Sequence, residues 1–409
     1  MNVREKRDAL LEEDLCDHCL GRQFAQLGHG LENYERGALA REIEELDEDD
    51  FVRENIPEDA SPGGSCDVCK GVFDELDDWV EMVENAFDRH ELSTFLVGIR
   101  PPGEVVATEE ELWEEYGLEW TEPIKTELSR LIGKRIERDL DIEVNFERPD
   151  IMAVVDMQEG KQRVELQVNS LLVYGQYNKY SRNIPQTVWH CRNCRGGGCE
   201  ECDWTGKQYQ ESVQEIIQEP FIRETNAIEA KFHGGGREDV DARCLGRREF
   251  VLELGEPLNR HIDLEELQEE VNESQDKVEI FELRFAEKDE IAEIKQKHVD
   301  KKYRAKVSLE DEVEDSDLEK LEQLVGTVKQ RTPERVEHRR ADKKRKREVY
   351  SVSWERTGEK EIELEIEAEA GTYIKELIHG DEGRTQPNAS DLLGTQAEVE
   401  ELDVIDIEK

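Results

Sequence analysis

The sequence predicts an α+β protein whose C-terminal half is built around a large mixed, mostly antiparallel sheet. Between Glu361 and Ala370 apolar residues alternate with acids, which is the pattern of a half-buried strand. Short apolar runs at 250–254, 278–285 and 399–407 also read as strands, and helical segments at 263–272, 317–325 and 373–379 are mixed among them. Strands and helices mixed in this way are typical of an α+β domain.

The N-terminal half predicts a smaller accessory region. Helices are expected at 77–90 and 121–140, and strands at 94–100, 142–146, 151–156 and 164–168. Glu219-Pro220 marks the expected boundary, because proline does not continue regular structure. We therefore predict a cysteine-bearing segment at 1–75, an accessory domain at 76–220 and a C-terminal domain at 226–409.

The composition is strongly acidic, yet it does not indicate general disorder. The 409 residues include 55 Lys and Arg against 102 Asp and Glu, a net charge of −47. Six Trp, eleven Phe and clear apolar periodicity favour two or three folded domains. Diffuse acidity is typical of the solvated surface of a halophilic protein, and the acid runs at 44–50 and 311–317 are expected to face solvent.

This acidity does not exclude a nucleic-acid partner. At 1 M salt the Debye length is about 3 Å, so only close contacts count. Residues 335–347 hold eight Lys or Arg and two acids. A basic cluster in so acidic a chain indicates that something anionic binds there. The alternative is a solvated helix face or a basic loop without a partner.

Neither a signal peptide nor a membrane span is expected. The first fifteen residues are charged, and no stretch approaches the ~20 apolar residues that a span needs. We therefore expect a cytoplasmic protein, and no obligate protein partner is evident. Eight of the nine cysteines form C-x-x-C pairs. In a reducing compartment such pairs indicate metal or redox chemistry rather than structural disulfides.

The first two cysteine pairs predict a structural zinc site. Cys16 and Cys19 form one pair, Cys66 and Cys69 the other, and each pair is followed by glycine within two residues. Two such knuckles brought together supply four thiolates in tetrahedral geometry. Redox dithiols are the alternative, but the strand–helix context of a thioredoxin is lacking.

A second cluster follows in a glycine-rich loop, where Cys191, Cys194, Cys199 and Cys202 have x2, x4, x2 spacing. This spacing predicts a second structural zinc, although the sequence leaves open whether the loop binds an ion of its own. Neither cluster has an open ligand position, so no catalytic metal is expected.

Aromatic and basic residues alternate after the predicted strand at 164–168. Tyr174, Tyr177 and Tyr180 are interleaved with Lys179 and Arg182. Aromatic rings stack on bases and cations contact phosphates, so this segment is a candidate RNA surface. An equally good interpretation places the tyrosines in the core, because a spacing of three residues does not separate the two.

Three ordered segments carry the candidate chemistry. Gly234–Gly236 form a turn that leads to Arg237 and Asp239, Tyr303 lies on a predicted strand, and Gly371 to Lys375 open a predicted helix. In this order the segments resemble the catalytic motifs of RNA pseudouridine synthases. That resemblance selects Asp239 over Asp241 as the nucleophile and makes Arg237 its companion. It also implies that Tyr303 stacks on the target and assists removal of the C5 proton, that Tyr373 contacts substrate, and that Lys375 bridges to Asp239.

The match is more particular at 236–243, 332–342 and 371–388, where the chain resembles the archaeal and eukaryotic tRNA pseudouridine-54/55 synthase family. The order helix, strand, Arg148-Pro149-Asp150, strand is similar to a THUMP domain, an RNA-binding module. The resemblance implies modification of T-loop uridines 54 and 55 of tRNA, without a cofactor for the chemistry. The basic cluster would then grip tRNA backbone, through Arg339, Arg340, Arg345, Lys346 and Arg347.

Two other functions are weighed against this one. A non-catalytic zinc- and THUMP-containing tRNA-binding protein could be built from the same parts. A thiolation enzyme or methyltransferase is disfavoured, because no G-x-G-x-x-G follows a strand. The lone Cys244 is interpreted as core packing. The sequence does not decide whether uridine 54, uridine 55 or both are modified.

Overall fold

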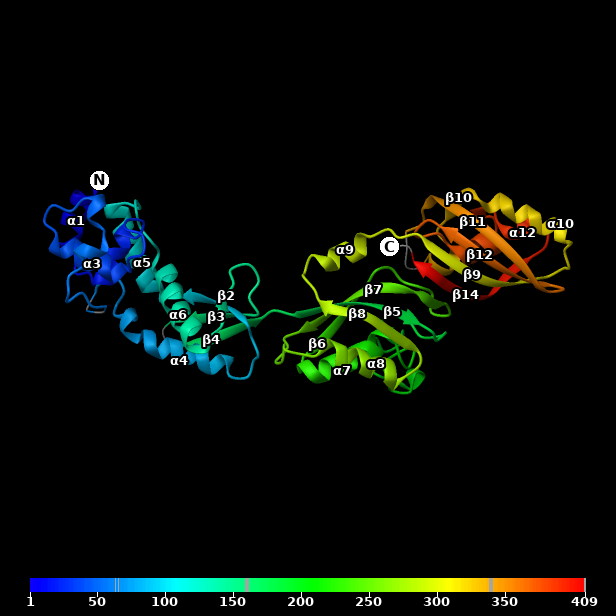
Figure 1. The fold of residues 1–409 in the computed structure, drawn as a ribbon, viewed down its shortest axis with the longest axis horizontal. Coiled ribbons are helices and arrows are strands. Elements are labelled where there is room, and N and C mark those ends of the chain that lie inside the picture. The colour runs from blue at the N-terminus through cyan, green and yellow to red at the C-terminus, as the bar shows by residue number, and fades with distance from the viewer. Residues whose placement is uncertain (63, 65, 159–161, 338–340, 408–409) are drawn as a thin grey trace. The chain divides into compact units, whose positions relative to one another are not determined.

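A computed structural model describes residues 1–62, 64, 66–158, 162–337 and 341–407 (Figure 1). The chain forms two compact units. Unit 1 comprises Met1–Ser170 with Glu256–His261, and unit 2 comprises Leu171–Gly255 with Ile262–Lys409. Across the described ranges, no helix has the length and apolar character needed to cross a membrane.

Unit 1 joins helices to a small four-stranded sheet. The sheet has the order β2-β1-β3-β4, with β1 (Thr94–Arg100) parallel to β2 (Glu143–Val144) and β3 (Ile151–Asp156), and with β4 (Arg163–Val168) antiparallel to β3. Phe95 on β1 and Ile132, on a helix that packs against the sheet, are fully buried in the core of unit 1. The helices are α1 (Val3–Leu10), α2 (Asp17–Gly21), α3 (Asn33–Glu42), α4 (Leu76–Phe87), α5 (Gly103–Tyr116) and α6 (Ile124–Leu140).

Unit 2 is organised by a ten-stranded sheet of order β13-β10-β11-β12-β9-β14-β7-β5-β8, with β6 also paired to β7. Within the described residues β14 and β7 run parallel, and the other pairs are antiparallel. The prediction of an α+β fold with a large, mostly antiparallel sheet is confirmed. The strands are β5 (Leu171–Lys179), β6 (Glu229–Gly234), β7 (Arg243–Gly255), β8 (Val278–Phe285), β9 (Lys301–Leu309), β10 (Gly326–Arg331), β11 (Lys344–Gly358), β12 (Glu361–Ala368), β13 (Thr385–Gln386) and β14 (Ala397–Ile407).

Helices cover two parts of this sheet and create two cores. Helices α7 (Val213–Thr225) and α8 (Leu264–Ser274) pack beside β5, β7 and β8, as Figure 1 shows. Helices α11 (Ile374–His379) and α12 (Ala389–Leu393) enclose a second core with β9, β12 and β14. Two short helices, α9 (Glu290–Gln296) and α10 (Asp315–Leu318), complete the unit.

The predicted boundary at 220 is wrong. Residues 171–220 belong to unit 2, because β5 pairs with both β7 and β8. Its side chains Val173 and Tyr177 are buried in the unit 2 core. Pro220 lies inside α7 rather than at a boundary. A proline inside a helix costs about 3 kcal/mol, and burial of Pro220 together with its neighbour Phe221 offsets that cost.

Candidate active site and cysteine clusters

The turn between β6 and β7 carries the predicted nucleophile. Gly236 has φ +87°, a left-handed conformation that other residues adopt only with strain. A Cβ at Gly236 would also lie 3.0 Å from Nη1 of Arg248. The Gly235 amide donates to the Glu249 carbonyl at 2.8 Å, which ties the turn to β7. Asp239 follows in this turn, with its side chain 36% exposed.

A cavity of about 390 Å³ opens beside Asp239. Tyr303 reaches it from β9, and Tyr373 and Lys375 reach it from the start of α11. The structure thus brings together residues from all three catalytic segments that the sequence singled out. The cavity is lined by Arg237, Glu238, Asp239, Ala242, Arg248, Lys301, Tyr303, Arg335, Val336, Gly371, Thr372, Tyr373, Ile374, Lys375, Leu402 and Val404.

Arg335 is the cation that contacts Asp239 most closely among the described residues. Its two terminal nitrogens each lie 3.2 Å from a carboxylate oxygen of Asp239. Its Nε donates to Glu376 at 2.6 Å, and the Glu376 side chain is only 1% exposed. Burial works against the cation, but Glu376 and Asp239 outweigh it and raise the pKa of Arg335. The guanidinium is therefore held between two carboxylates.

The sequence predicted Arg237 as the companion of Asp239, and it did not predict this contact with Arg335. The Arg237 guanidinium lies over the ring of Trp189, 4.9 Å from its centroid. This geometry is a cation–π contact, directed at the segment that leads into the second cysteine cluster. Arg335 was counted only as part of the basic cluster. Its position after Thr332-Pro333 was a usable signal, because those residues belong to the segment that resembles the synthase family.

Lys375 connects the two aspartates of the turn. Its Nζ lies 2.7 Å from Asp241 and 3.8 Å from Asp239. Partial burial opposes ionisation of Asp241, but the hydrogen bond from Lys375 outweighs it and lowers the pKa of that carboxyl. The expected bridge to Asp239 is present at the longer distance, and Asp241 holds the ammonium in place.

Tyr303 and Lys301 project from the same face of β9, because alternate residues of a strand share a face. Burial raises the pKa of Tyr303 to about 12, so the phenol is protonated at neutral pH. Burial, and next the charge of Arg248, lower the pKa of Lys301 to about 8. Lys301 was not singled out from the sequence, because a lysine at the start of a strand carries no local signal.

Two side chains that were predicted to contact RNA make contacts within the protein instead. Lys179 is fully buried, and its Nζ donates to the carbonyl oxygens of Ile184, Asp239 and Val240. Arg182 lies 2.8 Å from Asp403 and 2.9 Å from Glu401. A direct phosphate contact by Lys179 is therefore wrong, and the Arg182 guanidinium is engaged within the unit.

The tyrosines of the same segment divide between core and surface. Tyr177 is 0% exposed and Tyr174 is 9% exposed, whereas Tyr180 is 38% exposed. The core interpretation holds for the first two, because β5 is an interior strand of the sheet. Tyr180 alone retains an accessible ring.

The basic cluster begins as a short helical turn and ends on β11. Lys346 is exposed, while Arg345 donates to Thr332 at 3.1 Å and Arg347 lies 2.9 Å from Glu369. Arg339 and Arg340 lie outside the described residues. Lys346 is therefore the described member of the predicted set that is most available to an anion.

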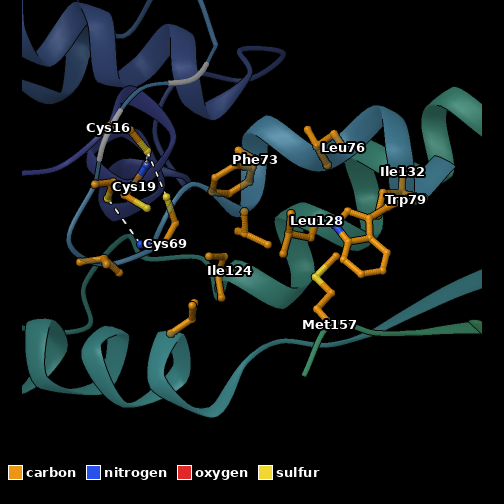
Figure 2. Close-up of a cluster of buried hydrophobic side chains, with 14 of the residues drawn as sticks. Cys16, Cys19, Cys69, Phe73, Leu76, Trp79, Ile124, Leu128, Ile132 and Met157 are labelled. Carbon is orange, nitrogen blue, oxygen red and sulfur yellow. Dashed lines mark hydrogen bonds between the residues drawn. The ribbon is translucent and has the colours of Figure 1, made fainter. Parts of the chain in front are cut away.

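The first four cysteines come together in unit 1 as predicted. Their sulfur atoms lie within 4.8 Å of one another and all four residues are buried. The Cys16 and Cys69 sulfurs are 3.7 Å apart, close to the ~3.8 Å edge of a ZnS₄ tetrahedron with 2.3 Å bonds. Figure 2 shows Cys16, Cys19 and Cys69 of this cluster near Phe73, in the apolar core formed with Leu76, Trp79, Ile124, Leu128 and Ile132.

The second cluster assembles from one loop of unit 2, independently of the first. The sulfur pairs Cys191–Cys199 and Cys194–Cys202 are 3.9 and 3.8 Å apart. Backbone amides point at the sulfurs, with Gly198 donating to Cys194 and Gly206 to Cys202, both at 3.2 Å. This donor set also suits four-thiolate zinc, so both clusters could hold an ion.

Comparison with known proteins decides the family. The family model described as "Pus10, C-terminal" matches residues 172–408, and the model "Pus10 THUMP domain, archaeal" matches residues 79–156. The chain belongs to the Pus10 family. The first match begins one residue after the start of unit 2, which supports the structural boundary at Leu171.

Curated relatives match along nearly their whole length. A protein of Methanothermobacter marburgensis named tRNA pseudouridine synthase Pus10 is 43% identical over 100% of this chain and 99% of that protein. One of Halorubrum lacusprofundi with the same name is 42% identical over 96% and 93%. Among solved structures, a chain of a Cbf5-Nop10-Gar1 complex matches with a TM-score of 0.28 and 20% identity, covering 47% of this chain and 44% of that chain.

Proposed function

We propose that this protein is a tRNA pseudouridine synthase that isomerises the T-loop uridines at positions 54 and 55, with Asp239 as nucleophile. The observation that carries the proposal is the cavity in which Asp239, Tyr303, Tyr373 and Lys375 meet. The names of the curated relatives agree with this activity. The THUMP match in unit 1 supports an RNA substrate.

The reaction needs a nucleophile, but it needs no net oxidation or added reactant. The bond from N1 of uracil to C1′ breaks, and the Asp239 carboxylate attacks or stabilises C1′. The freed base turns, C5 bonds to C1′ as Asp239 leaves, and C5 then loses its proton while N1 gains one. Arg335 and Lys375 contact the Asp239 carboxylate and hold it in place for this role.

The cavity supplies the other requirements of the chemistry. A target uridine must leave its stack and enter a pocket, where an aromatic face replaces the lost stacking. Tyr303 can provide that face and a hydrogen bond, since its phenol is protonated at neutral pH. Lys301 adds an amine on the same strand face, with a pKa near enough to neutrality to exchange a proton.

The proposal also gives roles to the two cysteine clusters and to the basic cluster at 335–347. Each cluster would hold a structural zinc that fixes its loop, through four thiolates and no open position. Lys346, with Arg339 and Arg340, would contact tRNA phosphates. These contacts position the substrate and carry no sequence information.

The test is made with unmodified tRNA transcript in molar KCl. Wild-type, Asp239→Asn and Asp241→Asn proteins are incubated with the transcript, and carbodiimide-induced reverse-transcription stops are mapped. The proposal expects T-loop stops with wild type, none with Asp239→Asn, and a reduced yield with Asp241→Asn, which only anchors Lys375. Binding of tRNA without stops for any protein would favour a non-catalytic tRNA-binding protein instead.

A further inference from the structure

The residue before Asp239 carries a buried carboxylate that the proposed chemistry does not use. The side chain of Glu238 is 0% exposed. Its oxygens lie 3.1 Å from Nε of Arg248 and 3.8 Å from Nζ of Lys179, whose side chains are at most 1% exposed. Burying charges costs several kcal/mol per ion unless they are paired and hydrogen-bonded. The negative charge of Glu238 therefore offsets part of the free-energy cost of burying these two cations.

The same two cations hold the backbone of the turn on both sides of Asp239. Lys179 donates to the carbonyl oxygens of Asp239 and Val240 at 3.2 and 3.1 Å. Arg248 donates through Nη1 to the carbonyl oxygen of Gly235 at 3.1 Å. Each cation thus pairs with Glu238 through one contact and binds the turn through another.

A third side chain, that of Gln186, also donates to the turn, and Tyr177 links it to Glu238. The Gln186 amide donates at 2.8 Å to both the Tyr177 hydroxyl oxygen and the Gly236 carbonyl oxygen. The Tyr177 hydroxyl in turn donates to Glu238 at 3.1 Å. Side chains linked to one carboxylate therefore bind four backbone carbonyls, those of Gly235, Gly236, Asp239 and Val240.

We propose that Glu238 is a positioning residue: it organises Arg248, Lys179 and Tyr177 so that the backbone of the turn presents Asp239 in one reactive geometry. The inference rests on the proposed role of Asp239. A buried network of ion pairs and hydrogen bonds of this kind restricts the turn to a single arrangement. A misplacement of ~1 Å at a reacting group can cost ~100-fold in rate.

The first test is Glu238→Gln, which removes the charge and keeps the shape. We expect the single-turnover rate at saturating tRNA to fall ~100-fold. The Kd for tRNA should stay within about threefold of wild type, because the Glu238 side chain lines the cavity but is 0% exposed and offers no free surface to RNA. Ile362→Ala, in the β12 core, serves as a control that lowers the Tm and keeps the rate.

A double variant separates positioning from stability. Glu238→Gln combined with Lys179→Met removes one buried cation with the carboxylate, so the Tm should recover toward wild type. The rate should stay low, because the carbonyls of Asp239 and Val240 have then lost their donor.

Two results would overturn the inference. One is a Glu238→Gln rate within about threefold of wild type, and the other is recovery of rate together with Tm in the double variant. Asp239→Asn is run beside them. Full activity of Asp239→Asn would refute the proposed function, whereas an inactive Asp239→Asn with an active Glu238→Gln would refute the role of Glu238 alone.

Discussion

Arg335 offers the sharpest test of how the active site is held. Arg335→Met keeps an unbranched side chain and removes the guanidinium. Two contacts to Asp239 at 3.2 Å and two to Glu376 at 2.6 and 3.4 Å are then lost. Because Glu376 is 1% exposed, the variant leaves a buried carboxylate without its cation. Losing one partner of a fully buried pair costs about 3–5 kcal/mol of folding stability, and the loss here should be smaller because the Arg335 side chain is 39% exposed.

The effect on catalysis is expected to be separate from this loss of stability. The guanidinium beside Asp239 fixes the direction of the carboxylate. Removal of one preorganised electrostatic contact of this kind costs about 10²–10³ in rate. Glu376→Gln is the matched control, because it weakens the anchor but leaves Arg335 beside Asp239. It should lose stability with a rate change below about tenfold.

The assay is a single-turnover measurement of pseudouridine formation with excess enzyme, at a temperature where circular dichroism shows each variant folded. Arg335→Met should bind tRNA and react at least ~100-fold more slowly. A rate within about threefold of wild type, per folded molecule, would refute the argument that Arg335 supports Asp239.

Three further predictions follow from the structure. Lys301→Met should stabilise the fold by up to ~3 kcal/mol at pH 7, because the pKa of Lys301 falls from 10.5 unfolded to about 8 folded. Between these two pKa values the unfolded chain binds more protons than the folded chain, so the stability of the wild type rises with pH over that window. The stability advantage of the variant should therefore vanish by about pH 10.5. A difference in urea midpoints that stays constant with pH would contradict this. Cys66→Ser should release one zinc equivalent by mass spectrometry and lower the Tm by unfolding the apolar core around Phe73, and an unchanged metal content would be the contrary outcome. Lys346→Gln should weaken tRNA binding and reduce the slope of log K against log salt by about one, without changing the site of modification; an unchanged slope would remove Lys346 from the RNA surface.

Elements with a strong local apolar pattern could be predicted from the sequence, whereas an element with a weak pattern could not. The strands at 94–100, 151–156 and 278–285 match the predicted bounds, because their apolar pattern is local and repeats every two residues. Helix α5 was missed, since only Val105, Glu109 and Leu112 of its acid-rich sequence are buried. An amphipathic stripe that thin gives little periodic signal.

The sequence by itself determined the fold class, because the alternation of apolar residues is a local pattern. It also determined both cysteine clusters, from the spacing of their pairs, and the three segments that line the cavity, from their resemblance to known catalytic motifs. Only the tertiary structure decided that β5 joins the large sheet of unit 2, that Lys179 is buried against the turn, and that Arg335 contacts Asp239. Strand pairing and ion pairing join residues that lie about 60 to 100 positions apart in the chain. Their partners are set by packing, which no local pattern encodes.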